Sequence, residues 1–329
     1  MSQPKIPLRD IFKNVPEDVA IHSLTAPNNV IYDTTDMQAP WPTDRIKVNQ
    51  DQVEIRSISE LEVMLSPGFL CGGIRQGRHN RYQEIAAQPG YKGPFGLSEG
   101  DSWQLYPFLL KDIVDHFIHA GKESIAVWST DCAGDTLMSM WQDRKKLYEY
   151  LNYLVYNYSP AHPSFMLLSG GGNDLLGDGR LSLMLNRYST GAIPDELIKK
   201  DDARHAINGV MHHFNLILNE LAGSFPKIKV FIHGYDYPVP MGDKWIGGPM
   251  KDMGITDPTL QRKVIRVFMD LYNAALSSTL SQHANATYVD VRNAVRDEND
   301  WHDEIHPKDR GFAAVAAIIR AAVKGEVVS

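Results

Sequence analysis

The feature that most constrains this chain is an alternation of short apolar runs with longer amphipathic segments after about residue 95. Apolar runs typical of buried strands lie at 94–98, 123–129, 164–172, 227–240 and 286–295. Helical spacing of apolar residues fills the intervals at 137–157, 195–226, 257–282 and 309–325. This alternation predicts an α/β fold, a three-layer α/β/α sandwich in which helices cover both faces of a parallel sheet.

The first part of the chain does not follow this alternation. Residues 26–44 are rich in Pro, Asn, Asp and Thr, which is typical of turns and loops. Asp51–Ile58 alternates as a short strand does, and a helical turn with a capping box could follow it. We therefore expect residues 1–92 to form an N-terminal extension or small accessory domain of unassigned fold, and residues 93–329 to form the main domain.

Composition narrows the class of protein. The net charge of -7 argues against nucleic acid as a partner, because phosphate binding requires a basic surface. The N-terminus lacks the apolar stretch of a signal peptide, and no run approaches the ~18 apolar residues of a membrane span. The two cysteines, Cys71 and Cys132, are expected to be reduced thiols. These features predict a cytoplasmic protein, unless an exported precursor has been trimmed.

Residues suited to nucleophilic catalysis occur in two loops that should follow strands, where parallel sheets place their functional groups. Asp101 directly precedes Ser102, and Asp303 lies three residues before His306. A serine hydroxyl needs a base to take its proton, and that base needs a third group to orient it. Pro307 disfavours a helix at His306, so Asp303 could accept from Nδ1–H and leave Nε2 facing Ser102.

Two further loops offer donors for a developing oxyanion. Gly134 could bring its backbone N–H close to a ligand, because it has no Cβ. Asn173 follows glycines at the end of a predicted strand, and its side-chain amide is a strong neutral donor. Asp300 and Glu304 could compete with Asp303 for the histidine, although Glu304 is interpreted as structural or exposed.

Together these segments resemble the SGNH/GDSL hydrolase superfamily. The sequence carries GDS at 100–102, AGDT at 133–136, GGND at 171–174 and DEIHP at 303–307, in the order of the four blocks of that family. The resemblance covers roughly residues 95–325. It implies a flavodoxin-like parallel sheet and a serine esterase or lipase that acts on a small-molecule ester without a metal or organic cofactor.

The resemblance also implies a role for each residue. Ser102 would be the nucleophile, His306 the base and Asp303 the group that orients it. The backbone N–H groups of Ser102 and Gly134, together with the Asn173 amide, would form the oxyanion hole.

Other interpretations remain open at this point. Ser102 could be only the N-cap of a helix predicted at 103–121. His302 and His306 are four apart, as in a zinc motif, although Asp303 stands where that motif has Glu, and Pro307 disfavours the helix it needs. The chain could be a carbohydrate O-acetyl esterase, or a catalytically silent binding protein on the same fold.

The loop at 233–254 is long, rich in Gly and Pro, and follows a predicted strand. We expect it to lie beside the site as a wall or lid of an apolar acyl pocket, with Tyr235, Tyr237 and Trp245 as candidate substrate-binding residues. Trp103, next to the serine, is expected to be packed in the core.

Overall fold

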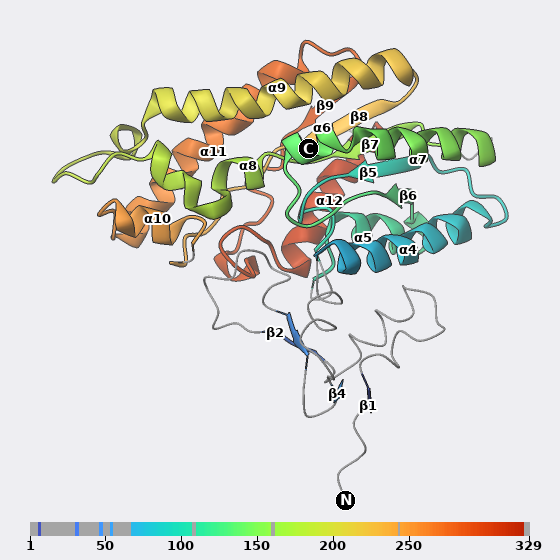
Figure 1. The fold of residues 1–329 in the computed structure, drawn as a ribbon, viewed down its shortest axis with the longest axis horizontal. Helices are drawn as coiled ribbons and strands as arrows, with labels where there is room; N and C mark the ends of the chain where they lie inside the picture. Colours follow the sequence, from blue (N-terminus) through green and yellow to red (C-terminus); the bar gives the residue numbers. More distant parts are fainter. Residues whose placement is uncertain are drawn as a thin grey trace, which may run out of the picture.

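The computed structural model describes, with their side chains, residues 71–106, 110–158, 162–242 and 244–325. It describes the backbone alone of residues 6–7, 30–32, 46–48, 53–54 and 67–70. Figure 1 shows a central sheet that lies between two layers of helices. The predicted three-layer α/β/α sandwich is therefore confirmed.

Five parallel strands form the central sheet, in the order β6-β5-β7-β8-β9. Each overlaps one of the segments predicted from the sequence. Their bounds are Phe95–Glu99 (β5), Ala126–Ser129 (β6), Phe165–Leu168 (β7), Lys229–His233 (β8) and Ala286–Val289 (β9). Leu97 of β5 lies opposite Trp128 of β6 and Met166 of β7. Strands β6 and β7 are buried throughout, as expected for parallel strands covered on both faces.

Helices α4, α5 and α12 cover one face of the sheet, and α6, α7, α9 and α11 cover the other (Figure 1). The helices are α4 (Pro67–Ala86), α5 (Ile113–Ile118), α6 (Leu137–Gln142), α7 (Arg144–Asn157), α8 (Gly172–Leu176), α9 (Lys200–Ser224), α10 (Gly247–Asp252), α11 (Pro258–Leu280) and α12 (Asp309–Lys324). Short 3-10 helices occupy Gly121–Glu123, Gly177–Met184, Pro194–Leu197 and Glu298–Asp300. The helix predicted at 137–157 forms as two helices that meet at Asp143.

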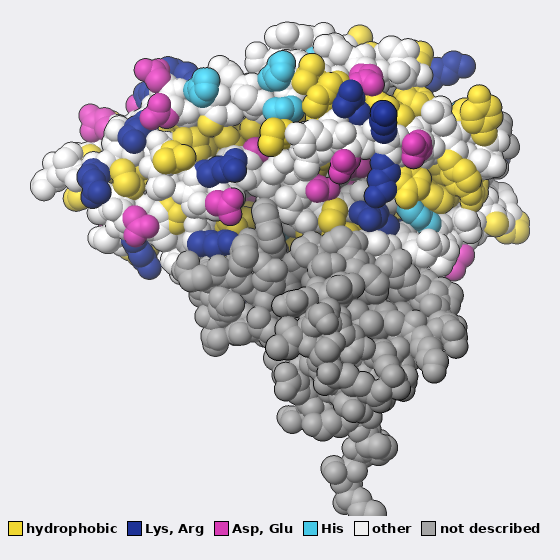
Figure 2. All heavy atoms as spheres, viewed as in Figure 1, with side chains coloured by type: hydrophobic (Ala, Val, Ile, Leu, Met, Phe, Trp, Pro, Cys, Tyr) yellow, Lys and Arg dark blue, Asp and Glu magenta, His cyan; other side chains and the backbone are white. Residues whose placement is uncertain are grey.

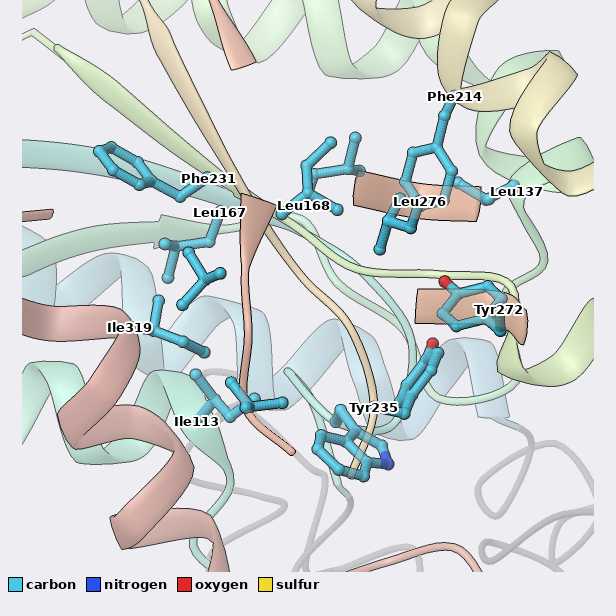
Figure 3. Close-up of a cluster of buried hydrophobic side chains, with 14 of the residues drawn as sticks. Ile113, Leu137, Leu167, Leu168, Phe214, Phe231, Tyr235, Tyr272, Leu276 and Ile319 are labelled. Carbon is cyan, nitrogen blue, oxygen red and sulfur yellow. The ribbon is translucent and has the colours of Figure 1, made fainter. Parts of the chain in front are cut away.

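Strand β7 shows how the core forms on both sides of the sheet (Figure 3). Successive residues of a strand point to opposite faces. Leu167 therefore lies on the side of Ile319 of α12, whereas Leu168 lies on the side of Leu276 of α11 and Phe214 of α9. All five side chains are buried. The central strand is thus held from both layers, and its carboxyl end has a fixed position.

Two small two-stranded sheets precede α4. Strand β1 (Ile6–Pro7) pairs in parallel with β4 (Val53–Glu54), and β2 (Val30–Tyr32) pairs antiparallel with β3 (Ile46–Val48). Strand β4 falls within the strand predicted at Asp51–Ile58. The helical turn predicted directly after it lies outside the described residues.

The helix predicted at 103–121, with Ser102 as its cap, is shorter and has another cap. Residues 101–104 form a turn, and α5 begins at Ile113. Asp112 caps α5, because its carboxylate accepts hydrogen bonds from backbone N–H groups of the first turn. The interpretation of Ser102 as an N-cap is therefore wrong, and its hydroxyl serves another contact.

The surface carries charges of both signs. On the face shown in Figure 2, Lys and Arg side chains are interspersed with Asp and Glu. The expectation that nucleic acid is not a partner stays a prediction. Within the described residues, no helix combines the length and the apolar character needed to cross a bilayer.

Helix α4 belongs to the same core as the helices that follow it, although it lies before the boundary predicted at residue 92. Tyr82 and Ile85 of α4 are fully buried in the main hydrophobic cluster. The helix also packs along β6 at the edge of the sheet. The division into two parts stays a prediction, and the packing places α4 with the main domain.

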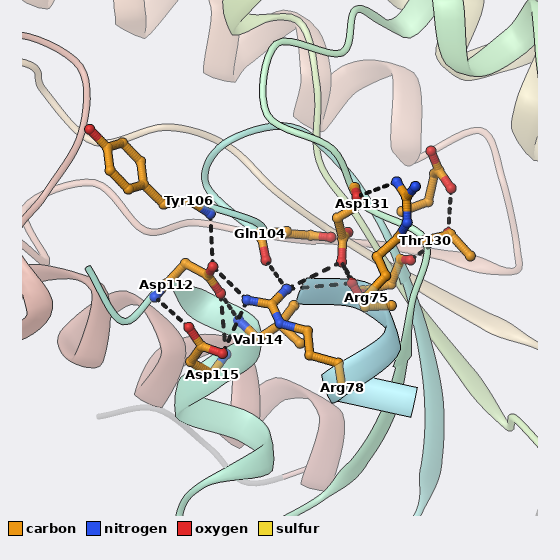
Figure 4. A network of polar contacts seen from close by, with 12 residues as sticks. Arg75, Arg78, Gln104, Tyr106, Asp112, Val114, Asp115, Thr130 and Asp131 are labelled. Atoms are coloured by element: carbon orange, nitrogen blue, oxygen red, sulfur yellow. Dashed lines mark hydrogen bonds and ion pairs between the residues drawn. The ribbon is translucent and has the colours of Figure 1, made fainter. Parts of the chain in front are cut away.

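Arg78 is a buried polar link between α4 and the loops beside it (Figure 4). Its Nη2 lies 2.6 Å from an oxygen of Asp112 and 3.1 Å from one of Asp115. Its Nη1 donates to the Gln104 carbonyl at 2.7 Å and lies 3.8 Å from Asp131. Burial works to lower the pKa of Arg78, but the surrounding carboxylates outweigh burial and raise it. The guanidinium therefore stays charged and neutralises this buried acidic cluster.

Replacing Arg78 by Met keeps the apolar stem but leaves the buried carboxylates without their cation. We expect the free energy of unfolding at pH 7 to fall by about 3–5 kcal/mol, as when one partner of a buried ion pair is removed. Urea denaturation followed by circular dichroism measures this loss. Arg204→Met is the control, because Arg204 pairs with the fully exposed Asp201 and should cost about 0–1 kcal/mol. Equal losses in the two variants would contradict the assignment.

Candidate active site

The polar residues singled out in the sequence lie beyond the carboxyl ends of the strands. Ser102 follows β5, Asn173 follows β7, and His306 lies between β9 and α12. In a parallel sheet the carboxyl ends of all strands meet at one edge. Residues far apart in the sequence therefore come together there.

Ser102, His306 and Asp303 form a chain of hydrogen bonds at this edge. Ser102 Oγ lies 2.6 Å from His306 Nε2, and His306 Nδ1 lies 2.9 Å from each carboxylate oxygen of Asp303. The three residues are 5%, 1% and 3% exposed, in that order. A serine hydroxyl that faces an imidazole, itself oriented by a carboxylate, is the arrangement in which serine acts as a nucleophile.

The turn that carries Asp303 and His306 is held by its own backbone. Asp303 Oδ1 accepts from the N–H groups of Ile305 at 3.0 Å and of His306 at 2.8 Å. Burial works to raise the pKa of Asp303, but the facing His306 and these hydrogen bonds outweigh it and hold the pKa below its ordinary value. The carboxylate is thus ionised and points at Nδ1.

The turn at Ser102 is braced from several directions. Asp101 accepts from the N–H of Trp103 and from the Ser169 hydroxyl, each at 3.1 Å. Trp103 Nε1 donates to the Ile305 carbonyl at 2.9 Å, which joins the serine turn to the histidine turn. Trp103 is buried, as predicted. These contacts hold Ser102 in front of the imidazole.

Asn173 lies near Ser102, and part of its amide is already in use. Asn173 Nδ2 donates to the Asp135 carbonyl at 2.9 Å, and both Asn173 and Ser102 line one cavity. An amide nitrogen carries two N–H groups, so one fixes the side chain and the other is left for a ligand oxygen. The arrangement suits the predicted oxyanion donor.

Gly134 lies in the loop that Asn173 contacts, with a φ of +90° that favours glycine. Asp135, its neighbour, supplies the carbonyl that holds Asn173. Gly134 is not among the described residues that line the cavity with Ser102. Its role as an oxyanion donor stays a prediction.

The cavity beside Ser102 has a volume of about 40 Å³. The serine turn and the start of α8 form one side of it. The other walls are mostly apolar and come from α8, α11, the loop after β8 and the histidine turn; they include Leu175, Leu176, Tyr235, Pro238, Phe268, Met269, Tyr272 and Ile305. The site is therefore a small, mostly apolar cavity, and Ser102 is one of the residues that line it.

Of the three residues predicted to bind substrate, Tyr235 alone lines this cavity. The Tyr237 hydroxyl donates to Asp270 at 2.6 Å, and its ring lies 3.8 Å from the Arg266 guanidinium, in a different hollow. Trp245 is buried with its ring centroid 6.2 Å from that of His306. The structure thus places Tyr237 in another hollow and Trp245 in an edge-to-face contact with His306, outside the cavity lining.

Tyr235 connects the serine turn to the start of α8. Its hydroxyl donates to the Asp101 carboxylate and accepts from the Gly172 N–H at 3.3 Å. Burial, and then the negative charge of Asp101, raise the pKa of Tyr235 well above its ordinary value. The phenol therefore stays protonated and links the serine turn to the turn that leads to Asn173.

Glu304 was interpreted as structural or exposed, and the structure shows that it is fully buried. Its carboxylate accepts four backbone N–H groups of the loop after β8 and the first residue of α10, at 2.7–2.9 Å. They belong to Met241, Gly242, Ile246 and Gly247. Glu304 therefore holds this loop against the histidine turn.

The zinc interpretation finds no support in the geometry. His302 and His306 lie in a bend rather than on a helix, and the His302 N–H donates to the His306 carbonyl at 2.8 Å. Within the described ranges, no three His, Cys, Asp or Glu side chains group in a way that could hold a metal ion.

Sequence analysis missed the wall that α11 contributes. Phe268, Met269 and Tyr272 line the cavity, and all three also belong to the buried face of α11. Their spacing is that of any amphipathic helix packed on a core. No signal in the sequence separates a residue that lines a cavity from one that fills the core.

Solved structures similar to this chain include a lipase, a phospholipase and a carbohydrate esterase. No family model and no curated protein matches the sequence. The structure is similar to an extracellular lipase from Streptomyces rimosus, with 15% identity and a TM-score of 0.48 over 70% of this chain and 100% of the other. It is also similar to phospholipase A1 from Streptomyces albidoflavus NA297, with 14% identity and a TM-score of 0.47 over 70% and 99%.

A third similar structure is a carbohydrate esterase family 3 protein from Talaromyces cellulolyticus, with 13% identity and a TM-score of 0.38 over 71% and 100%. At such identities the chemistry must be argued from the residues of this chain.

Proposed function

We propose that this chain is a serine hydrolase of the SGNH/GDSL type that cleaves carboxylic esters of small molecules through an acyl-enzyme. The observation that carries the proposal is the 2.6 Å contact between Ser102 Oγ and His306 Nε2, with Asp303 on the other ring nitrogen. The four sequence blocks and the apolar cavity beside the hydroxyl support it.

The reaction begins at the Ser102 hydroxyl. Oγ forms a bond to the ester carbonyl carbon while His306 Nε2 takes the hydroxyl proton. The π electrons of the carbonyl move to its oxygen, which becomes an oxyanion. Asp303 holds the imidazole by Nδ1–H and stabilises the positive charge that forms on the ring.

Fixed donors stabilise the oxyanion. The backbone N–H of Ser102 and the second N–H of the Asn173 amide are the donors we assign first, with the Gly134 N–H as the third. Donors that are already oriented need no reorganisation when the charge develops. The bond from Asn173 to the Asp135 carbonyl supplies that orientation.

Collapse of the tetrahedral intermediate completes acylation. The bond from carbon to the alcohol oxygen breaks, and His306 gives its proton to the leaving alcohol. A water molecule then attacks the acyl-enzyme as His306 takes a proton from it. The bond from Ser102 Oγ to the acyl carbon then breaks, and His306 returns the proton to Oγ. The carboxylic acid leaves, and the free enzyme is restored.

Replacing Ser102 by Ala removes the nucleophile. We expect kcat toward p-nitrophenyl esters to fall by on the order of 10⁶, and covalent labelling by a fluorophosphonate to disappear. Ser281→Ala, which alters the exposed serine directly after α11, is the control and should leave both unchanged. Labelling that survives in Ser102→Ala would contradict the proposal, as would loss of wild-type turnover on adding EDTA.

Replacing Asn173 by Ala removes one oxyanion donor but leaves the nucleophile and base in place. We expect kcat to fall by roughly 10²–10³, with a much smaller change in KM. Steady-state kinetics measure this, with the exposed Asn208→Ala on α9 as the matched control. If KM rises and kcat stays unchanged, Asn173 binds the ground state and the assignment is wrong.

The pKa of Asp303 determines the shape of the acid limb of the pH profile. Because this pKa lies below its ordinary value of about 3.9, the Asp303 carboxylate stays ionised and adds no second protonation to the acid limb above about pH 4. We expect log(kcat/KM) to fall with a slope of one, not two, between the upper end of that limb and about pH 4. Stopped assays in overlapping buffers measure the slope, and a slope of two would show that two groups titrate together.

A further inference from the structure

The position of the cavity relative to Ser102 and His306 indicates which part of an ester it binds. Ser102 and Asn173 line it, whereas His306 is not among its described lining residues. The leaving alcohol must lie where His306 Nε2 can protonate it. The cavity therefore takes the other substituent of the carbonyl, which is the acyl chain.

The size of the cavity limits that chain. An apolar cavity of about 150 Å³ holds a benzene ring, so a cavity of about 40 Å³ holds only a short acyl chain. An acetyl, propionyl or butyryl chain fits within this limit. A longer chain would have to displace side chains or leave its methylenes in water.

The walls are braced against expansion. The Tyr272 hydroxyl donates to the Gly170 carbonyl at 2.6 Å, and Tyr272 is buried. Gly171 has a φ of +100°, and a Cβ there would lie 2.8 Å from Val210 and 3.0 Å from Tyr272. Glycine thus permits a close approach that holds the ring of Tyr272 over the cavity. Well-packed walls of this kind resist enlargement, because overpacking costs free energy.

The chemistry of the walls selects an apolar acyl group. Asp101 and Asp236 are the acidic residues that line the cavity, and their oxygens already accept hydrogen bonds from the protein. An acyl chain with its own carboxylate would meet these negative charges without a cation among the lining residues. Uncharged short chains are therefore favoured.

We propose that this cavity is the acyl site, that it accepts chains from acetyl to butyryl, and that Met269 of α11 limits the length. This inference rests on the proposed ester hydrolysis. Met269 is 4% exposed, lines the cavity and makes no side-chain hydrogen bond that a substitution would break. Its side chain is long, unbranched and apolar, so shortening it enlarges the cavity and removes no polar partner.

The first experiment measures kcat/KM of the wild type for p-nitrophenyl acetate, butyrate, octanoate and laurate, with Ser102→Ala as the blank. We expect the maximum at acetate or butyrate, and a value for octanoate at least about tenfold lower, since its further methylenes must displace packed side chains and this costs free energy. A maximum at octanoate or laurate would overturn the acyl-site proposal and leave ester hydrolysis standing. Absence of turnover that depends on Ser102, at every chain length, would overturn the proposed function itself.

The second experiment widens the cavity. Met269→Ala should raise the ratio of octanoate to acetate kcat/KM by at least about tenfold. Met269→Val should raise the ratio less, and it is the variant to measure if Met269→Ala does not fold. Met138→Ala, at an exposed position of α6, is the matched control and should leave the ratio unchanged. A folded Met269 variant with the wild-type ratio would show that another wall sets the length and would contradict the proposal.

Discussion

The hydrogen bond between Ser102 and His306 joins residues that lie 204 positions apart in the chain, and the organisation of the sheet makes this contact possible. Strand β5 lies inside the sheet, so the turn after it faces the edge where the later strands also end. Helix α12, which follows the histidine turn directly, packs on α5. The bond from Trp103 Nε1 to the Ile305 carbonyl then sets the spacing of the two turns.

Adjacent carboxylates in the histidine turn serve different purposes because they face different partners. Asp303 points toward the imidazole and the backbone of its own turn, which keeps it ionised beside a group that must become positive. Glu304 points the other way and accepts four N–H groups of the loop after β8. A buried carboxylate is stable only when its oxygens are satisfied, and both carboxylates accept several backbone N–H groups. The histidine turn and the loop behind it therefore form one polar unit.

Sequence analysis predicted the parts of this molecule that follow from local rules. The alternation of strands and helices gave the sheet, and the Pro after His306, with an Asp three residues before, gave the histidine turn. What it missed depends on contacts between distant segments. Arg78 lies before the predicted boundary at 92 yet holds loops of the main domain together, and its charge alone does not indicate burial. Tyr235 and Tyr237 are equivalent in the sequence, but only the folded loop directs one into the site and the other toward Asp270.

The position of Tyr235 explains why the length of the acyl chain should be controlled from α11. Its hydroxyl bonds Asp101 on one side and the Gly172 N–H on the other, while its ring forms part of the cavity wall. A change at Tyr235 would thus alter the serine turn and the approach to Asn173 together with the cavity. The Met269 side chain makes no such hydrogen bonds to the serine turn or to α8. It reaches the cavity from α11, a long helix whose backbone hydrogen bonds do not depend on this side chain. Variation at that position can change the space for the substrate while the reacting groups keep their geometry.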